Sequence, residues 1–249
     1  MRKIHSADAV GQALAVDVSG CLSRGVPVVL VHGMGSDHST WAPAVRMLRA
    51  TCRPTIAVDL RGHGRSDHAE SYRLDDFADD LGRVVDDLGV DRFDLVGHSL
   101  GAHAALRYSM ANPERVRRLV LEEVPPMPRD ENDVAEKIAP AASLGERLRG
   151  IRALAANPGP FLRFDRALPE AVTSQFDVPE PAWWDRLAGV SAPTLVISGG
   201  DRSFLPPRHL RSVADALPDG RMVTIDAGHS VHRDRTTDFL AALIDHLDD

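Results

Sequence analysis

The sequence predicts an α/β protein in which helices cover both faces of a mostly parallel sheet. Two observations lead to this class. Short apolar runs such as VPVVLVHG (26–33) alternate along the chain with segments of helical spacing. Strands of a parallel sheet are buried on both faces, so they appear as continuous apolar runs. The chain of 249 residues, 43% hydrophobic and 26% charged, is long enough to bury one such core.

The first half of the chain supplies four expected strands. They are ALAVDVSG (13–20), VPVVLVHG (26–33), PTIAVDLRG (54–62) and FDLVGHS (93–99). A helix is expected at WAPAVRMLRA (41–50). A second is expected over 74–88, where Leu74, Phe77, Leu81, Val84, Val85 and Leu88 recur at helical spacing.

The second half continues the same alternation. A helix is expected from the residue after Ser99 to Asn112, where Pro113 stops it. Further strands are expected at VRRLVLEEV (116–124), PTLVISGG (193–200) and RMVTIDAG (221–228), and further helices near 207–217 and 234–247.

One segment, 125–184, interrupts this alternation. It contains no clear buried strand, nine of the 17 prolines and five of the 12 aromatic residues. The composition indicates an inserted lid of local helices. Most of its aromatic residues are expected to fill a small core of their own.

Composition excludes several classes of function. The formal net charge is −7 and no block of basic residues occurs, so neither nucleic acid nor an anionic membrane is an expected partner. Cys21 and Cys52 match no metal-ligand spacing, and no apolar stretch is long enough to span a bilayer. The first 16 residues interrupt their apolar run with polar residues, so we expect no leader and a cytoplasmic location.

A candidate nucleophile lies in LVGHSLG (95–101). Ser99 stands between Gly97 and Gly101, after an expected strand and before an expected helix. This is the context of a nucleophile elbow, in which a tight turn exposes the serine hydroxyl and small neighbours let strand and helix approach. The alternative is a serine that only forms a turn, and the surrounding context disfavours it.

A serine hydroxyl needs a general base and an acid that orients the base. His229 and Asp201 both follow expected strands, and the order serine, acid, histidine is the one found with such elbows. We therefore predict Asp201 as the acid, with Glu122 and Glu123 as the alternative. The backbone N–H groups of Met34 and Leu100 are predicted to form the oxyanion hole.

The other polar residues of these loops have structural interpretations. His32, His63 and His98 are expected to hydrogen-bond among the loops around the site. Asp59 and Arg61 are expected to fix the turn after the strand 54–62. His232 lies three residues after His229, a spacing that suggests a metal site. We do not predict one, because the sequence shows no matching carboxylate or cysteine cluster.

With these motifs in order, the chain resembles the α/β-hydrolase superfamily. The matching pieces are HGMG (32–35), DLRGHGRSD (59–67), GHSLG (97–101), Asp201 in SGGDRSFLP, and AGHSVHR (227–233). The resemblance implies an eight-stranded sheet with a helical lid between the sixth and seventh strands. The core would then be 1–124 with 185–249, and the lid 125–184. Ala102 departs from the second glycine common in relatives, with little expected effect.

The resemblance and the residues together predict an enzyme. We expect a serine hydrolase that cleaves a carboxylic ester, lactone or thioester of a small, fairly apolar molecule, with no cofactor and no metal. Two alternatives stay open: hydrolysis of a carbon–carbon bond next to a ketone, and a small-molecule receptor without catalysis. The candidates for lining the substrate site are His32, His98, Phe161, Phe164, Trp183, Trp184 and Leu205. Sequence alone identifies neither the substrate nor the oligomeric state.

Overall fold

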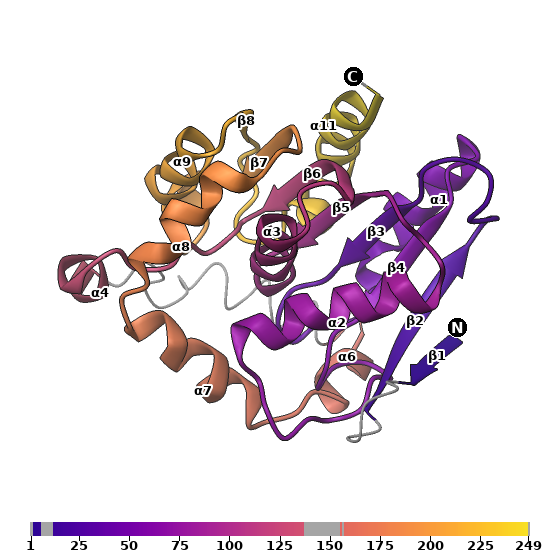
Figure 1. Cartoon of the computed structure of the whole chain (residues 1–249), viewed down its shortest axis with the longest axis horizontal. Helices are drawn as coiled ribbons and strands as arrows, with labels where there is room; N and C mark the ends of the chain where they lie inside the picture. The colour runs from indigo at the N-terminus through magenta and orange to yellow at the C-terminus, as the bar shows by residue number, and fades with distance from the viewer. Residues whose placement is uncertain (1, 6–11, 137–154, 156, 249) are drawn as a thin grey trace.

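The computed structural model describes residues 2–5, 12–136, 155 and 157–248. Its centre is one eight-stranded sheet with the order β1-β2-β4-β3-β5-β6-β7-β8 (Figure 1). The strands are β1 (Arg2–His5), β2 (Ala13–Ser19), β3 (Val28–Val31), β4 (Thr55–Asp59), β5 (Phe93–His98), β6 (Val116–Glu122), β7 (Thr194–Ser198) and β8 (Gly220–Thr224). Only β2 runs antiparallel to its neighbours, β1 and β4. The predicted fold class is therefore confirmed.

The sequence missed one strand. β1 has only four residues, RKIH, of which one is aliphatic, so it carries no readable apolar pattern. It forms the edge of the sheet through antiparallel pairing with β2. Six of the other seven strands fall within the predicted ranges, and β8 begins one residue before its range; all seven are shorter than predicted.

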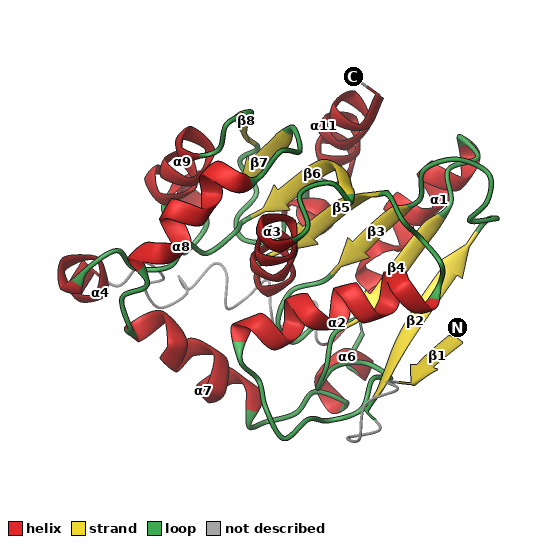
Figure 2. Ribbon diagram, in the orientation of Figure 1, coloured by secondary structure: helices red, strands yellow, loops and turns green. Residues whose placement is uncertain are grey.

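Helices cover both faces of the sheet, as predicted (Figure 2). On one face, α2 (Leu74–Asp87), α3 (Leu100–Ala111) and α9 (Pro207–Ala216) contribute to one apolar cluster. On the other face, α1 (Ala42–Ala50) and α11 (Thr236–Asp248) contribute to a second cluster. The sheet is thus buried on both sides, which explains its continuous apolar strands. No helix of the described residues is both long and apolar enough to cross a membrane.

Between β6 and β7 the described residues form helices and no strand. These are α4 (Glu131–Glu136), α6 (Gly159–Leu162), α7 (Leu168–Thr173), η2 (Ser174–Asp177), α8 (Pro181–Arg186) and η3 (Leu187–Gly189). Part of the predicted insertion, 137–154 with 156, lies outside the described residues. We call 125–184 the inserted segment.

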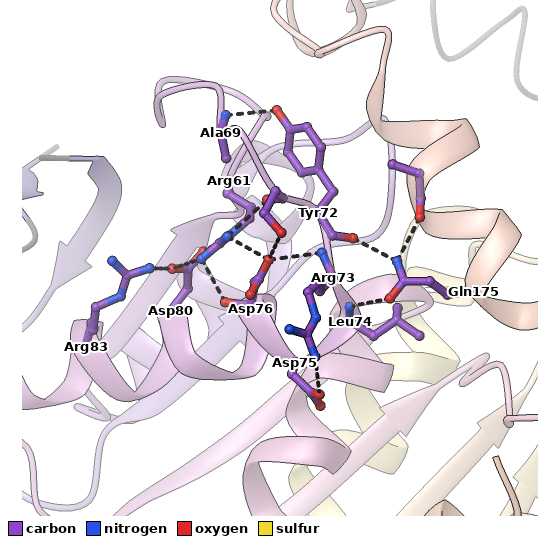
Figure 3. Close-up of polar contacts among 12 residues, drawn as sticks. Arg61, Ala69, Tyr72, Arg73, Leu74, Asp75, Asp76, Asp80, Arg83 and Gln175 are labelled. Carbon is purple, nitrogen blue, oxygen red and sulfur yellow. Dashed lines mark hydrogen bonds and ion pairs between the residues drawn. The ribbon is translucent and has the colours of Figure 1, made fainter. Parts of the chain in front are cut away.

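Gln175 ties the inserted segment to the core. Its side chain accepts a hydrogen bond from the Leu74 amide and donates to the Tyr72 carbonyl (Figure 3). Both partners lie at the start of α2. The segment is therefore held to the chain that enters α2 by specific polar contacts.

The turn after β4 has the structural role that the sequence predicted. The Arg61 guanidinium donates two hydrogen bonds to the buried Asp80 carboxylate of α2 (Figure 3). The Asp59 carboxylate accepts from the amides of His38 and Arg65. A Cβ atom at Gly64 would lie 2.4 Å from the Asp59 carboxyl group, so only glycine fits there.

Candidate active site

Ser99 occupies a strained turn between β5 and α3. Its φ of 52° and ψ of −117° put a non-glycine residue in a sparsely populated region. The neighbouring glycines make the turn possible: a Cβ at Gly97 would lie 2.5 Å from the Gly101 carbonyl oxygen, and one at Gly101 would lie 2.4 Å from that of His32. Ala102 is fully buried beside this contact. The geometry is that of the predicted nucleophile elbow.

The catalytic base predicted from sequence lies against this serine. The His229 Nε2 atom is 2.9 Å from the Ser99 Oγ atom. His229 follows β8, so two strand ends far apart in the sequence bring the pair together. The Phe204 ring packs on the imidazole, with ring centroids 4.1 Å apart. The sequence analysis named Leu205, which is fully buried, and missed Phe204 beside it.

The structure does not bring the predicted acid, Asp201, into contact with the predicted base. The His229 Nδ1 atom is 3.1 Å from the Glu123 Oε2 atom, and no hydrogen bond or ion pair joins Asp201 to His229 among the described residues. Asp201 is exposed in a 3-10 turn, η4 (Gly200–Arg202). The carboxylate that meets His229 therefore comes from the end of β6, the alternative that the sequence left open, and Glu123 is the candidate acid.

Backbone geometry decides between the two acids. Glu123 follows β6 with a φ of 54°, and its amide donates to the Ile197 carbonyl of β7. The turn leaves its side chain fully buried against His229. After β7, Gly200 has a φ of 73° and the turn directs Asp201 outward. The signal in the sequence was the pair of acids ending a strand, and a periodicity argument cannot rank them.

Three donors meet the Glu123 carboxylate. They are the Gly199 amide, the Ser203 hydroxyl and the His229 ring. Burial raises the pKa of Glu123 to about 8, whereas the hydrogen bonds from Gly199 and Ser203 act to lower it. A buried carboxylate of this kind gains strongly from a positive imidazolium beside it. Ser203 was not predicted, and it lies two residues after Asp201.

The loop after β3 carries the candidate oxyanion hole. No hydrogen bond from the Met34 or Leu100 amide is present among the described residues, so both predicted donors are available. The next amide, that of Gly35, donates to the His63 Nε2 atom and so fixes the loop. Leu100 begins α3, where a helix N-terminus favours negative charge.

The other predicted histidines hold these loops. His32 is fully buried, with its Nδ1 atom 2.8 Å from the Gly33 carbonyl oxygen and its Nε2 atom accepting from the Leu60 amide. The His98 Nε2 atom is 2.7 Å from the His229 carbonyl oxygen. Burial lowers the pKa of both His63 and His98 to about 3, so both rings are neutral at pH 7. His32 and His98 were also named as substrate-lining candidates, and their burial favours the structural interpretation.

The four named aromatic residues of the inserted segment occupy different environments. Trp183 is fully buried and stacks on His103 of α3, which does not fit the prediction that it contacts substrate. Trp184 donates its indole N–H to the Met127 carbonyl and lies under Arg129. Phe161 is 51% exposed. Phe164 packs on His63, with ring centroids 4.9 Å apart, and so lies nearest the candidate oxyanion loop.

The structure also corrects the reason for excluding a metal. Glu122 does accompany His232, and with His98 the three residues offer ligand atoms within 4.8 Å of one another. All three side chains are buried. Glu122 is 110 positions from His232 in the sequence, so no spacing motif could have revealed the group.

Comparisons with known proteins agree with this geometry. A model described as the alpha/beta hydrolase family matches residues 28–243. The chain is 26% identical over 246 residues to the sn-1-specific diacylglycerol lipase ABHD11 of Mus musculus, covering 88% of this chain and 80% of that protein. It is 29% identical over 246 residues to the 2-hydroxymuconate semialdehyde hydrolase of Pseudomonas sp. (strain CF600), covering 90% and 87%.

A solved structure adds to these relatives. Est816, described as an N-acyl homoserine lactone degrading enzyme, aligns with a TM-score of 0.77 and 26% identity over 97% of this chain and 98% of that one. The chain therefore belongs to the alpha/beta hydrolase family and is an enzyme of the hydrolase kind.

Proposed function

We propose that this protein is a serine hydrolase that cleaves a carboxylic ester, lactone or thioester of a small, fairly apolar molecule. One observation carries the proposal. A continuous hydrogen-bonded chain runs from the Ser99 hydroxyl through His229 to the Glu123 carboxylate, and it begins at a strained elbow. Such a chain raises the nucleophilicity of the hydroxyl and serves acyl transfer.

The reaction follows from this chain. The Ser99 Oγ atom attacks the substrate carbonyl while the His229 Nε2 atom takes the hydroxyl proton. The amides of Met34 and Leu100 donate to the oxyanion that forms. The intermediate collapses to an acyl-enzyme, and His229 passes its proton to the departing alcohol or thiol. Water, deprotonated by His229, then releases the acid and restores Ser99. Glu123 holds the imidazole and stabilises its charged form.

The substrate class rests on the surroundings of the site and on relatives. We propose that the inserted segment acts as a lid, since Phe164 contacts His63, which fixes the candidate oxyanion loop. Phe204 packs directly on His229, and with Phe164 on the loop beside the site it favours an apolar acyl or leaving group. One relative is named a diacylglycerol lipase, and one structural neighbour is described as an N-acyl homoserine lactone degrading enzyme, which agrees with this substrate class.

Relatives also support a second candidate, hydrolysis of a carbon–carbon bond. Two relatives with 28% and 29% identity over about nine-tenths of this chain are named 2-hydroxy-6-oxo-2,4-heptadienoate hydrolase and 2-hydroxymuconate semialdehyde hydrolase. The same serine, base and oxyanion donors would then act on a ketone next to the bond that breaks.

A labelling experiment followed by a substrate panel tests both proposals. We expect a fluorophosphonate probe to modify the protein once, with the adduct mapped to Ser99 by mass spectrometry, and Ser99→Ala to abolish it. Turnover of short p-nitrophenyl esters, lactones and acyl thioesters supports acyl transfer. Turnover of a vinylogous 1,5-diketone alone supports the second candidate. If the probe does not react and no substrate turns over while apolar carbonyl compounds bind, the protein is a receptor and both proposals are wrong.

A further inference from the structure

A second hydrogen-bonded chain lies behind the first and repeats its order of groups. The Thr40 Oγ1 atom is 2.6 Å from the His232 Nε2 atom, and the His232 Nδ1 atom is 2.8 Å from the Glu122 Oε2 atom. Hydroxyl, imidazole and carboxylate thus occur twice, and the two carboxylates are consecutive residues. His232 is only 4% exposed and packs on Trp41, with ring centroids 4.5 Å apart.

This second chain holds the backbone that carries His229. Besides its ring contact, His232 donates its backbone N–H to the Glu122 Oε1 atom at 2.9 Å. At the other end, the His98 ring donates from Nε2 to the His229 carbonyl oxygen. His98 and Glu122 are paired residues in the register of β5 and β6. Both ends of the segment from His229 to His232 are therefore tied to one pair of neighbouring residues in the sheet, His98 and Glu122.

The same two strand ends also carry the reacting groups. Ser99 follows His98 and Glu123 follows Glu122. Each strand end therefore presents one residue to the imidazole of His229 and one to the backbone of the segment from His229 to His232. The Ser99 amide also donates to the Glu122 carbonyl at 2.8 Å. A shift of the His98 and Glu122 pair would therefore move the candidate nucleophile, base and acid together.

Metal binding fits these side chains less well. The Nδ1 and Nε2 atoms of His232 already have partners in Glu122 and Thr40, and the Nε2 atom of His98 has one in His229. The remaining His98 Nδ1 atom is buried without a partner among the described residues, and a Cβ at Gly33 would lie 2.6 Å from it. A cation would have to displace several hydrogen bonds in a closed space.

We infer that His98, Glu122 and His232 are positioning residues that keep the His229 imidazole between Ser99 and Glu123. This inference rests on the proposed function and deepens it. Thr40 is not a second nucleophile, since it belongs to a 3-10 helix, η1 (His38–Trp41), and its base is closed from solvent. An error of about 1 Å in the placement of a catalytic group costs about 100-fold in rate.

Paired variants test this role. His98→Leu removes the donor to the His229 carbonyl, whereas the amide nitrogen of His98→Gln can replace the Nε2 donor. His232→Leu removes the ring donor to Glu122 and keeps the backbone donor, whereas His232→Asn can replace the Nδ1 donor. We expect each leucine variant to lower kcat about 10- to 100-fold with KM changed less than threefold. We expect each amide variant to recover most of that loss. Rates of fluorophosphonate labelling should follow kcat.

Asp94→Asn is the matched control. Asp94 is a fully buried carboxylate on β5 as well, bound by Arg53 and Arg117. We expect this variant to lower the Tm and to leave kcat unchanged. If the leucine variants lower only the Tm, as this control does, or if the amide variants recover nothing, the positioning role is wrong.

Two further outcomes separate the possible failures. Wild-type protein that neither reacts with the probe nor turns over any ester contradicts the proposed function itself, before any variant is compared. Wild-type protein that purifies with one equivalent of a transition metal by mass spectrometry, lost in His98→Leu and His232→Leu, overturns the positioning role in favour of a metal site.

Discussion

The two hydroxyl, imidazole and carboxylate chains differ in their surroundings more than in their internal geometry. In the first, Ser99 stands on a strained elbow beside two free amides, and both Ser99 and His229 are partly exposed. In the second, Thr40 lies in a 3-10 helix and His232 is closed beneath Trp41. The imidazole contacts are similar, with distances between 2.6 and 3.1 Å in both.

The difference shows which features make an active site. An ordered hydroxyl and imidazole occur in both chains, so they are not sufficient. A partly exposed imidazole, and neighbouring amides without a hydrogen bond among the described residues that could bind an oxyanion, accompany the first chain, whereas the imidazole of the second is buried. The pKa values of the adjacent residues Glu122 and Glu123 are also shifted in opposite directions. Burial raises the pKa of Glu123 to about 8. Burial also acts to raise the pKa of Glu122, but His232 and His98 lower it to about 2.

The largest expected effect compares the two hydroxyls. Ser99→Ala should reduce kcat by at least about 10⁴-fold, because it removes the nucleophile. Thr40→Val should reduce kcat less than about tenfold, because it removes only a support of His232. Steady-state kinetics on one activated ester measures both. Equal losses in the two variants would mean that the second chain takes part in the chemistry.

The next effect compares the two acids that sequence could not rank. Glu123→Gln should lower kcat about 10³- to 10⁴-fold, since the protonated imidazole loses the carboxylate that pairs with it. Asp201→Asn should change kcat less than threefold, because Asp201 is exposed and away from the imidazole. The same kinetics measures both, with circular dichroism as a check on folding. A larger loss in Asp201→Asn would restore the acid that the sequence predicted.

A smaller effect concerns two aromatic residues of the inserted segment. Phe164→Ala should raise KM about tenfold for an apolar ester but not for a minimal acetate, since it removes apolar surface near the site. Trp183→Ala should instead lower stability by about 3 to 5 kcal/mol, because the ring is fully buried. Unaltered ester preference in Phe164→Ala would make the inserted segment structural only.

The smallest expected effect concerns stability, which should depend on pH in opposite directions for Glu122 and Glu123. The pKa of Glu122 is lower in the folded protein than its value of about 4.5 in the unfolded chain. Glu122 therefore stabilises the fold above pH 4.5, and this stabilisation is lost as the pH falls toward 2. The pKa of Glu123 is higher in the folded protein than in the unfolded chain. Glu123 therefore stabilises the fold most below about pH 4.5, and this stabilisation is lost as the pH rises through about 8. Each slope is at most about 1.4 kcal/mol per pH unit, or a few degrees in Tm.

Thermal melts of Glu122→Gln and Glu123→Gln against wild type test these signs. The stability advantage of wild type over Glu122→Gln should shrink from pH 5 to pH 3. Its advantage over Glu123→Gln should shrink from pH 5 to pH 8. Parallel slopes would show that the two carboxylates titrate alike and that their surroundings do not separate them.

Local patterns in the sequence determined the fold class and singled out the candidate nucleophile and the candidate base. Apolar runs of strand length and the 3.6-residue spacing of helices are properties of neighbouring residues, and so is the glycine pair around Ser99. The sequence did not predict the edge strand β1, because four mainly polar residues carry no such pattern. The order of motifs also predicted His229, because strands in a parallel sheet end at a common edge.

Only the tertiary structure decided which acid meets His229 and which second hydrogen-bonded chain lies next to it. Asp201 and Glu123 both follow strands that end at that edge, and their directions depend on single backbone turns whose conformations come from packing. The contact of Glu122 with His232 joins residues 110 positions apart, in neighbouring elements that the sequence does not place side by side. Sequence periodicity reports which face of an element is buried. It does not report which two buried polar groups face each other, because that depends on how the elements pack.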